Sequence, residues 1–151
     1  MSSELTQIDD FTQLFIGDTP LIDTRAPIEF DQGAFPYTTS LPLMSDKERE
    51  LVGTCYKNKG QEKAIELGHE LVQGEVKQER LDTWLEFIKN NPNGALYCFR
   101  GGMRSQITQQ WIYEASGINY PRIKGGYKAL RRFLIDETDR IMGQVTPIVI
   151  G

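Results

Sequence analysis

The chain has 151 residues with two cysteines and one histidine, and 17 Lys and Arg residues against 21 Asp and Glu residues give a net charge of −4. One domain with a substantial core is expected at this length. The acidic balance argues against a general nucleic-acid clamp, and two cysteines are too few for a disulfide scaffold. The sequence has no apolar run near the roughly 18 residues of a membrane span and no visible secretion signal, so we expect a cytoplasmic protein with no membrane partner.

Short helical, extended and loop patterns alternate over the first part of the chain. The predicted elements are a helix at 8–15, a strand at 20–23, a loop at 24–35 and a strand at 38–41. Asp9 or Asp10 supplies the N-cap of the helix. Pro42 ends the second strand, because proline cannot donate a backbone hydrogen bond to a neighbouring strand.

The stretch from about 45 to 90 is predicted to be almost entirely helical. Ser45 and Glu48 have the spacing of a capping box, which opens a helix that continues to about Lys57. A second helix is predicted at 61–72. A third carries apolar residues at the helical spacing i, i+3, i+4, i+7, namely Leu81, Trp84, Leu85 and Ile88.

Strands and helices alternate again after the Asn-Pro-Asn-Gly breaker at 91–94. The predicted elements are a strand at 95–97, a helix that ends near Gly117, a strand at 120–123, a helix that starts after 125–126 and a short helix at 136–142. Strands that alternate with helices in this way predict an α/β fold with a parallel sheet.

The last five residues, 147–151, have the pattern of an apolar strand followed by glycine. This pattern is typical of the start of a phosphate-binding loop, and it fits a final edge strand equally well. We therefore expect a first domain at 1–143. The segment 144–151 is either the start of a truncated second domain or a terminal edge strand.

The segment from Cys98 to Ser105 contains the strongest candidates for catalytic and anion-binding residues. Cys98 follows the predicted strand 95–97 and precedes a predicted helix, so it lies at the carboxyl end of a strand, where open parallel sheets bind ligands. The helix start offers free N–H groups, and Arg100 and Arg104 add positive charge, which together favour a thiolate and a bound anion. We interpret Cys98 as a nucleophile rather than an inert buried cysteine.

Other reactive or charged residues have simpler interpretations. Cys55 is expected to pack within a helix, with a resolving or second thiol as the alternative. His69 is expected to be structural or to lie at the rim of a site, and without a second histidine a metal site or a Cys-His dyad has little support. Asp23 and Arg25 are either a surface ion pair or a pair that supports the active loop. A basic cluster near the chain's end is either a solvated helix face or a contact for RNA phosphate. That cluster comprises Lys124, Lys128, Arg131 and Arg132.

Four segments, in their order and spacing, resemble the rhodanese superfamily. They are Leu21-Ile22-Asp23-Thr24-Arg25, Glu29-Phe30 with Gly33-Ala34-Phe35-Pro36, the Cys98 loop, and Ile123-Lys124-Gly125-Gly126-Tyr127. The resemblance covers roughly residues 11–133. It implies a rhodanese-like parallel sheet with helices on both faces, into which the helical stretch at about 45–90 is inserted.

Three segments are similar to a narrower group, the tRNA 2-selenouridine synthase family. They are the Cys98–Ser105 segment, Gly53-Thr54-Cys55-Tyr56-Lys57 and Leu67-Gly68-His69-Glu70-Leu71. Members have an N-terminal rhodanese domain and a C-terminal P-loop domain, so the resemblance implies that 144–151 begins the second domain. The implied activity is replacement of sulfur by selenium in 2-thiouridine at the tRNA wobble position. Selenophosphate is the donor, and a geranylated intermediate is made from geranyl diphosphate.

The resemblance also implies roles for residues of this chain. Cys98 would carry or receive the chalcogen, with Asp23 and Arg25 as the supporting pair. The residues expected to hold the anion are Phe99, Arg100, Gly101, Gly102, Met103 and Arg104. We expect a transferase without a bound cofactor or metal, which contacts tRNA mostly through the second domain.

One departure from many single-domain rhodaneses leaves other classes open. The spacing from Cys98 to Arg104 is Cys-x5-Arg instead of Cys-x4-Arg, as in rhodanese-like phosphatases. Tyr97 stands where that group usually has histidine, and no general acid is identifiable. The alternatives are a phosphatase, a generic thiosulfate-type sulfurtransferase and a non-catalytic rhodanese-like binding module. The intact cysteine, glycines and arginines argue against the binding module.

Overall fold

An all-parallel sheet of five strands forms the centre of the structure, a computed structural model that describes residues 5–144. The strand order is β1-β5-β4-β2-β3, so β4 is the middle strand. The strands are β1 Gln7–Ile8, β2 Leu21–Asp23, β3 Thr38–Ser40, β4 Ala95–Tyr97 and β5 Arg122–Ile123. Because all pairs are parallel, the carboxyl ends of the strands meet at one edge of the sheet.

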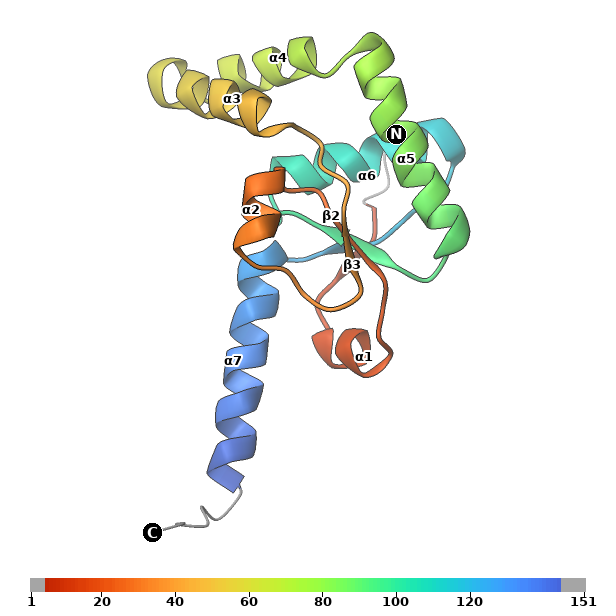
Figure 1. Cartoon of the computed structure of the whole chain (residues 1–151), viewed down its shortest axis with the longest axis vertical. Coiled ribbons are helices and arrows are strands. Elements are labelled where there is room, and N and C mark those ends of the chain that lie inside the picture. The colour runs from red at the N-terminus through yellow and green to blue at the C-terminus, as the bar shows by residue number, and fades with distance from the viewer. Residues whose placement is uncertain (1–4, 145–151) are drawn as a thin grey trace.

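Helices surround this sheet in the described part of the chain (Figure 1). They are α1 Phe11–Ile16, α2 Pro27–Gln32, α3 Asp46–Lys59, α4 Gln61–Leu71, α5 Gly74–Asn90, α6 Met103–Ser116 and α7 Gly126–Gln144. The expected α/β fold is therefore confirmed, and its arrangement is consistent with a rhodanese-like fold.

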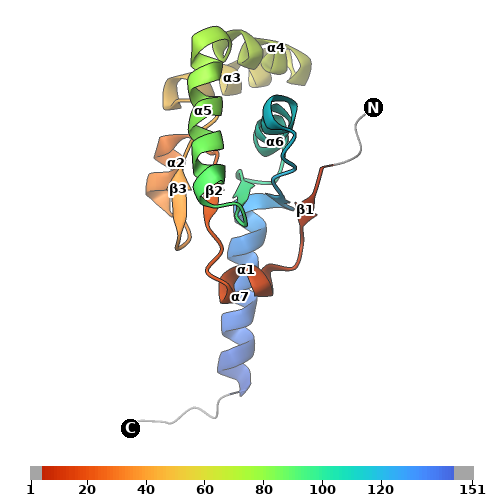
Figure 2. The ribbon, with the colours of Figure 1, turned by 90° about the vertical axis from the view of Figure 1, so that its right-hand side faces the viewer.

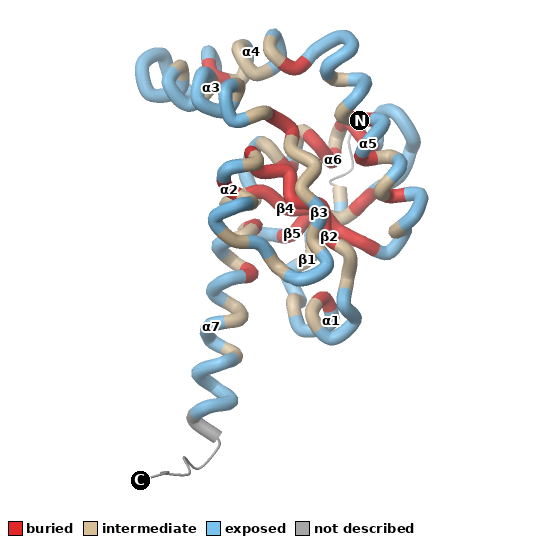
Figure 3. Tube along the Cα trace, in the orientation of Figure 1, coloured by how far each residue is buried: buried red, intermediate tan, exposed pale blue. Residues whose placement is uncertain are grey.

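Apolar side chains alternate along the strands and build a core on each face of the sheet. On one face, Ile22 and Leu96 belong to a cluster with Trp84 of α5 and Ile112 of α6. The cluster on the other face contains side chains from several strands and helices, namely Leu14, Leu21, Ala95, Tyr97, Ile123 and Leu130. The buried residues accordingly concentrate along the strands and the helix faces turned toward them (Figure 3). Helices cover both faces, as expected.

The helical insertion expected at about 45–90 is confirmed as α3, α4 and α5. Ser45 caps α3, because its Oγ accepts a hydrogen bond from the Glu48 backbone N–H (3.2 Å) while Glu48 Oε1 accepts one from the Ser45 N–H (2.9 Å). α5 joins the core through Trp84, whose indole N–H donates to the Leu41 carbonyl (2.9 Å). α3 and α4 form a hairpin that extends from the sheet at the top of Figure 1.

The helix α7 is longer than predicted and projects away from the sheet (Figures 1 and 2). It runs without a break over the separate short helix predicted at 136–142. Leu130 near its start is buried, whereas Ile135 and Ile141 are exposed. Within residues 5–144, α7 and the other helices are too short or too polar to cross a membrane.

Two further predictions are wrong in detail. The segment 24–35 is not a loop throughout, because it contains α2, which begins at Pro27, a position where the missing N–H of proline costs no helical hydrogen bond. Ile8 belongs to β1 rather than to a helix, and α1 begins after its N-cap Asp10. The strand predicted at 147–151 lies outside the described residues.

Candidate active site

Cys98 directly follows β4, the middle strand, and lies in the loop that leads to α6. The N-cap of α6 is Gly102, which has no side chain to occupy the free N–H groups of the first turn. These N–H groups and the positive end of the helix dipole face the same loop. The Cys98 side chain is only 2% exposed, so the thiol lies at the inner end of the loop.

The Cys98 thiol has one close polar partner, Ser105. The distance from Cys98 Sγ to Ser105 Oγ is 3.1 Å, and the Ser105 hydroxyl lies 3.3 Å from the Gly102 carbonyl oxygen. Ser105 is fully buried in the first turn of α6. Because its hydroxyl can rotate, Ser105 can accept from the thiol or donate to a thiolate. Sequence reasoning did not assign Ser105 a role, although Ser105 directly follows Arg104.

A second loop, at the start of α7, contacts the Cys98 loop through backbone hydrogen bonds. The Tyr127 N–H donates to the Cys98 carbonyl (2.8 Å), and the Lys128 N–H donates to the Phe99 carbonyl (3.0 Å). Gly101 has φ +72, and a Cβ there would lie 2.6 Å from the Gly125 nitrogen. Gly126 has φ +61, and a Cβ there would meet the Cys98 carbonyl oxygen, so glycine is required on both loops where they meet.

Arg104 is held by a carboxylate from α2. Its Nη1 lies 2.6 Å from Glu29 Oε1, and Arg49 Nε of α3 lies 3.1 Å from the same oxygen. Burial alone would raise the pKa of Glu29, but the hydrogen bond and charge of Arg104, together with Arg49, outweigh it and lower the pKa. Glu29 thus stays ionised and fixes the guanidinium beside the loop. In the sequence, Glu29 belongs to one of the segments that resemble the rhodanese superfamily, but its ion pair with Arg104 was not predicted.

Arg100 differs from Arg104 because it is exposed and forms no ion pair with any described residue. Its guanidinium carbon lies 5.5 Å from the centre of the Phe99 ring, and Lys128 Nζ lies 5.7 Å from the same ring. The Phe99 ring also stacks on Tyr127, with ring centres 6.1 Å apart. The outer part of the loop therefore presents positive charge around an aromatic ring.

Asp23 and Arg25 form a buried pair beneath the loop, with 2.7 Å between Arg25 Nη2 and Asp23 Oδ2. The same carboxylate oxygen accepts a hydrogen bond from the Tyr97 hydroxyl (2.8 Å). Burial, and then the charge of Asp23, raise the pKa of Tyr97. Arg25 also donates to the Gly33 carbonyl (2.7 Å). The pair is thus not a surface ion pair, and it fixes the residue that immediately precedes Cys98.

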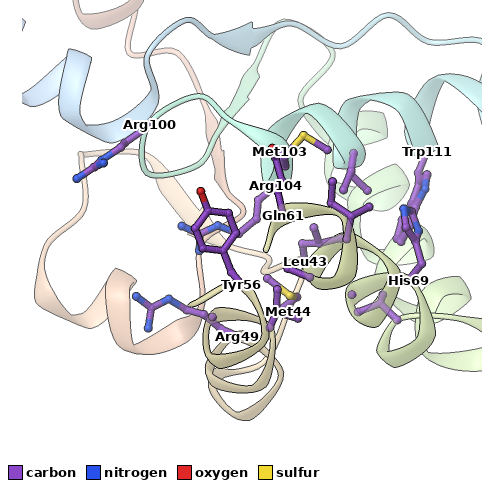
Figure 4. Close-up of a pocket in the computed structure, with 17 residues that line it drawn as sticks. Leu43, Met44, Arg49, Tyr56, Gln61, His69, Arg100, Met103, Arg104 and Trp111 are labelled. Carbon is purple, nitrogen blue, oxygen red and sulfur yellow. The ribbon is translucent and has the colours of Figure 1, made fainter. Parts of the chain in front are cut away.

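A cavity of about 500 Å³ lies beside the loop, between α3, α4 and α6 (Figure 4). Arg100, Met103 and Arg104 of the loop line one part of it, whereas Cys98 does not line it. His69 lies at its wall with its ring centre 6.0 Å from that of Trp111. Sequence reasoning did not find this cavity, because residues from three separate helices enclose it.

The remaining candidates lie away from the Cys98 loop. Cys55 lines a separate groove between α3 and α4. Arg131 and Arg132 are exposed on α7, where Arg132 pairs with Asp136 (3.3 Å), which fits a solvated helix face. The described residues contain no group of three or more His, Cys, Asp or Glu side chains that could hold a metal ion.

Fold and site together define an α/β domain with a cysteine loop at the carboxyl edge of a parallel sheet. No family model matches the chain. A solved structure, the N-terminal domain of a protein from Clostridium difficile 630 described as ATP/GTP binding, aligns with a TM-score of 0.72 and 28% identity. The alignment covers 86% of this chain and 99% of that one.

Relatives with higher identity are named tRNA 2-selenouridine synthase. The protein of Photobacterium profundum is 62% identical over 141 residues, and that of Pseudomonas putida (strain GB-1) is 56% identical over 142 residues. The alignments cover 93% and 94% of this chain, but only 38% of each relative. The chain thus spans little more than a third of the length of these relatives.

Proposed function

We propose that the chain is a rhodanese-like chalcogen-transfer domain that takes part in forming 2-selenouridine in tRNA, with Cys98 as its catalytic residue. The observation that carries the proposal is the position of Cys98 at the carboxyl end of the middle strand and at the free N-terminus of α6. A helix N-terminus favours the thiolate, which is the reactive form. The names of relatives that are 56–62% identical support the same reaction.

The loop also has the groups needed to hold selenophosphate, the proposed donor. The free N–H groups of the loop and of α6 can donate to anionic oxygens, while Arg100 and Arg104 supply positive charge. The residues assigned to this anion site are Phe99, Arg100, Gly101, Gly102, Met103 and Arg104. Asp23 and Arg25 support the site from below through Tyr97.

The proposed reaction needs more than this chain. We assign residues 1–143 to the rhodanese-like domain and place tRNA recognition mostly in the part of the relatives beyond the matched segment. Geranyl diphosphate is the proposed co-substrate for a geranylated intermediate. The proposed location of the reaction is the cytoplasm.

A phosphatase is the second candidate, because Cys98 and Arg104 have the Cys-x5-Arg spacing and Ser105 contacts the thiol. Against it, the carboxylate nearest the loop arginine, Glu29, is ionised in an ion pair and so is a poor general acid. Selenophosphate is a tetrahedral anion like phosphate. The Cys-x5-Arg loop, which is one residue longer than the Cys-x4-Arg loop of many rhodaneses, therefore suits chalcogen transfer from selenophosphate as well as phosphate hydrolysis.

The two candidates can be separated with the variant Cys98→Ser. Wild-type full-length protein is expected to form 2-selenouridine from thiolated tRNA and selenophosphate, and Cys98→Ser is expected to lose about a thousand-fold of this activity. Wild-type activity in Cys98→Ser would contradict the proposal. Turnover of an aryl phosphate by the wild-type chain, lost in Cys98→Ser, would favour the phosphatase, and cysteine-dependent transfer from thiosulfate alone would favour a generic sulfurtransferase.

A further inference from the structure

Arg122 of β5 is a buried arginine that reaches the Cys98 loop from the neighbouring strand. β5 pairs with β4, the strand that ends immediately before Cys98. The Arg122 Nη1 donates a hydrogen bond to the Gly101 carbonyl of the loop (2.9 Å). Arginine is almost never buried unless specific acceptors take up its donors, so this contact is a fixed part of the loop structure.

Gln109 of α6 sets the direction of the Arg122 side chain. Both hydrogens of the Gln109 amide are used, because Nε2 donates to the carbonyls of Thr6 and Tyr120, each at 2.8 Å. The amide oxygen therefore faces the other way, where it accepts from Arg122 Nε (3.1 Å). A guanidinium is planar and presents its N–H groups in fixed directions. With Nε held by Gln109, Nη1 is aimed at the Gly101 carbonyl.

The Gly101 carbonyl and the Gly102 N–H belong to one peptide group. In a trans peptide the two bonds point in opposite directions, so the Gly102 N–H points away from Arg122. This N–H makes no hydrogen bond within residues 5–144, and Gly102 is exposed. A peptide between two glycines rotates easily, because neither residue has a Cβ to restrict it. The hydrogen bond from Arg122 opposes that rotation.

We propose that Arg122 is a positioning residue, which holds the Gly101–Gly102 peptide so that the Gly102 N–H faces an anion bound at the Cys98 loop. The inference rests on the proposed function, because the anion site is the one assigned to that loop. A donor held in place before binding stabilises an oxyanion more than one that must first reorient. If the peptide rotated, the Gly101 carbonyl would face the anion and repel it. Arg122 thus acts through the peptide.

Amide NMR of the wild-type 151-residue chain tests the direction of the Gly102 N–H without any substitution. Inorganic phosphate is titrated into isotope-labelled protein, and sodium chloride keeps the ionic strength constant. The Gly102 amide proton is expected to move downfield as phosphate binds, because its N–H becomes a donor to a charged oxygen. A Gly102 signal that does not move, or an absence of phosphate binding, would overturn the proposal.

Two substitutions at Arg122 test its role in holding the peptide. Arg122→Met keeps a long side chain but removes the donors, and it is expected to weaken phosphate binding by about tenfold. Arg122→Lys can still donate to the Gly101 carbonyl and is expected to recover most of this loss. Wild-type affinity in Arg122→Met, or no recovery in Arg122→Lys, would overturn the proposal. If Arg122→Met fails to fold, Arg122→Lys is expected to keep the downfield movement of Gly102, and a signal that stays still would contradict the proposal.

A control variant separates positioning from loss of stability. The Tyr120 hydroxyl donates to the Asn91 carbonyl (2.8 Å), on the side of the sheet where β4 begins rather than where it ends. Tyr120→Phe removes this hydrogen bond and is expected to lower the urea midpoint while leaving phosphate affinity unchanged. Weaker phosphate binding in Tyr120→Phe, to the extent seen in Arg122→Met, would show that Arg122 is merely structural and would overturn the proposal.

Kinetics of the full-length protein distinguish this inference from the proposed function. Arg122→Met is expected to raise KM for selenophosphate by about tenfold with a smaller change in kcat, because the N–H contact is already made in the bound ground state. A fall in kcat with KM unchanged would overturn the positioning role. Selenouridine formation by Cys98→Ser would instead refute the proposed function, and the phosphate measurements would still decide the role of Arg122.

Discussion

At the scale of single residues, the contact between Cys98 and Ser105 bears most directly on the proposed reactivity of the thiol. Ser105 is fully buried and contacts Sγ at 3.1 Å, so it is the side chain best placed to stabilise a thiolate. A serine hydroxyl can donate to sulfur in this state and accept from it in the thiol state. We therefore expect Ser105 to position the proposed nucleophile, Cys98, and to stabilise its charged form.

The variant Ser105→Ala is expected to lower kcat for 2-selenouridine formation by about ten- to a hundred-fold, with little change in KM, because it removes a donor to the thiolate. Its rate of alkylation at Cys98 should also fall. Ser116→Ala on the same helix, whose hydroxyl donates to the Ile112 carbonyl, is the control and should keep both rates. An unchanged kcat and alkylation rate in Ser105→Ala would remove Ser105 from the mechanism.

Glu29 allows a prediction about pH. Its pKa is lowered in the folded protein, so its ionised form contributes stability above the unfolded pKa of about 4.3, and this contribution disappears as the pH falls through the lower folded pKa. Glu29→Gln is expected to cost about 1–2 kcal/mol at pH 7, because it weakens the pairs with Arg104 and Arg49. The difference from wild type should shrink below about pH 5.

Urea unfolding at pH 7 and at pH 4 measures this difference directly. Glu50→Gln, an exposed residue on α3 without an ion pair among the described residues, is the matched control and should differ little from wild type at either pH. A cost of Glu29→Gln that is the same at both pH values would show that the charge of Glu29 is not what stabilises the protein.

At the scale of elements, α3 and α4 enclose the cavity, and the capping box of Ser45 and Glu48 sets where α3 begins. Arg80 of α5 stabilises the N-terminus of α3 through an ion pair, because its Nη1 lies 2.7 Å from Glu48 Oε1. The hairpin is thus tied to α5, which packs on the sheet through Trp84.

Ser45→Ala is expected to lower the free energy of unfolding by about 1 kcal/mol, because the first turn of α3 loses its side-chain acceptor. Chemical unfolding measures the change. Lys47→Ala, an exposed neighbour in the same turn, should stay within about 0.5 kcal/mol of wild type. A Ser45→Ala variant as stable as wild type would mean that tertiary packing alone fixes the start of α3.

Strands β2 to β5, the insertion and the Cys98 loop were predicted from the sequence because local signals mark each of them, whereas the two-residue strand β1 was not predicted. α2 was not predicted, because Pro27 and Gly33 usually indicate a loop, whereas here they begin and cap a short helix. The Cys98–Ser105 hydrogen bond depends on how the loop turns into α6, and the Glu29–Arg104 pair joins residues 75 positions apart. The cavity needs the packing of three helices. Helix and strand propensities and the spacing of residues in the sequence do not predict such long-range contacts.

At the scale of the whole molecule, the loop, the cavity and α7 are parts of a protein whose relatives are much longer. The chain covers only 38% of those relatives, and α7 leads away from the sheet (Figure 2). The 151-residue chain alone is therefore expected to form no 2-selenouridine from thiolated tRNA and selenophosphate, while the full-length protein does. Nucleoside analysis of the tRNA measures the product. Full turnover by the chain alone would contradict the assignment of tRNA recognition to the remaining part.

The catalytic role proposed for Cys98 is tested most directly by the initial rate of selenium transfer from labelled selenophosphate to tRNA by full-length variants. We expect a wild-type rate for Cys55→Ser, a reduced rate for Ser105→Ala, and a rate about a thousand-fold below wild type for Cys98→Ser. Selenium transfer by Cys98→Ser at the wild-type rate, or loss of transfer in Cys55→Ser but not in Cys98→Ser, would contradict the catalytic role proposed for Cys98.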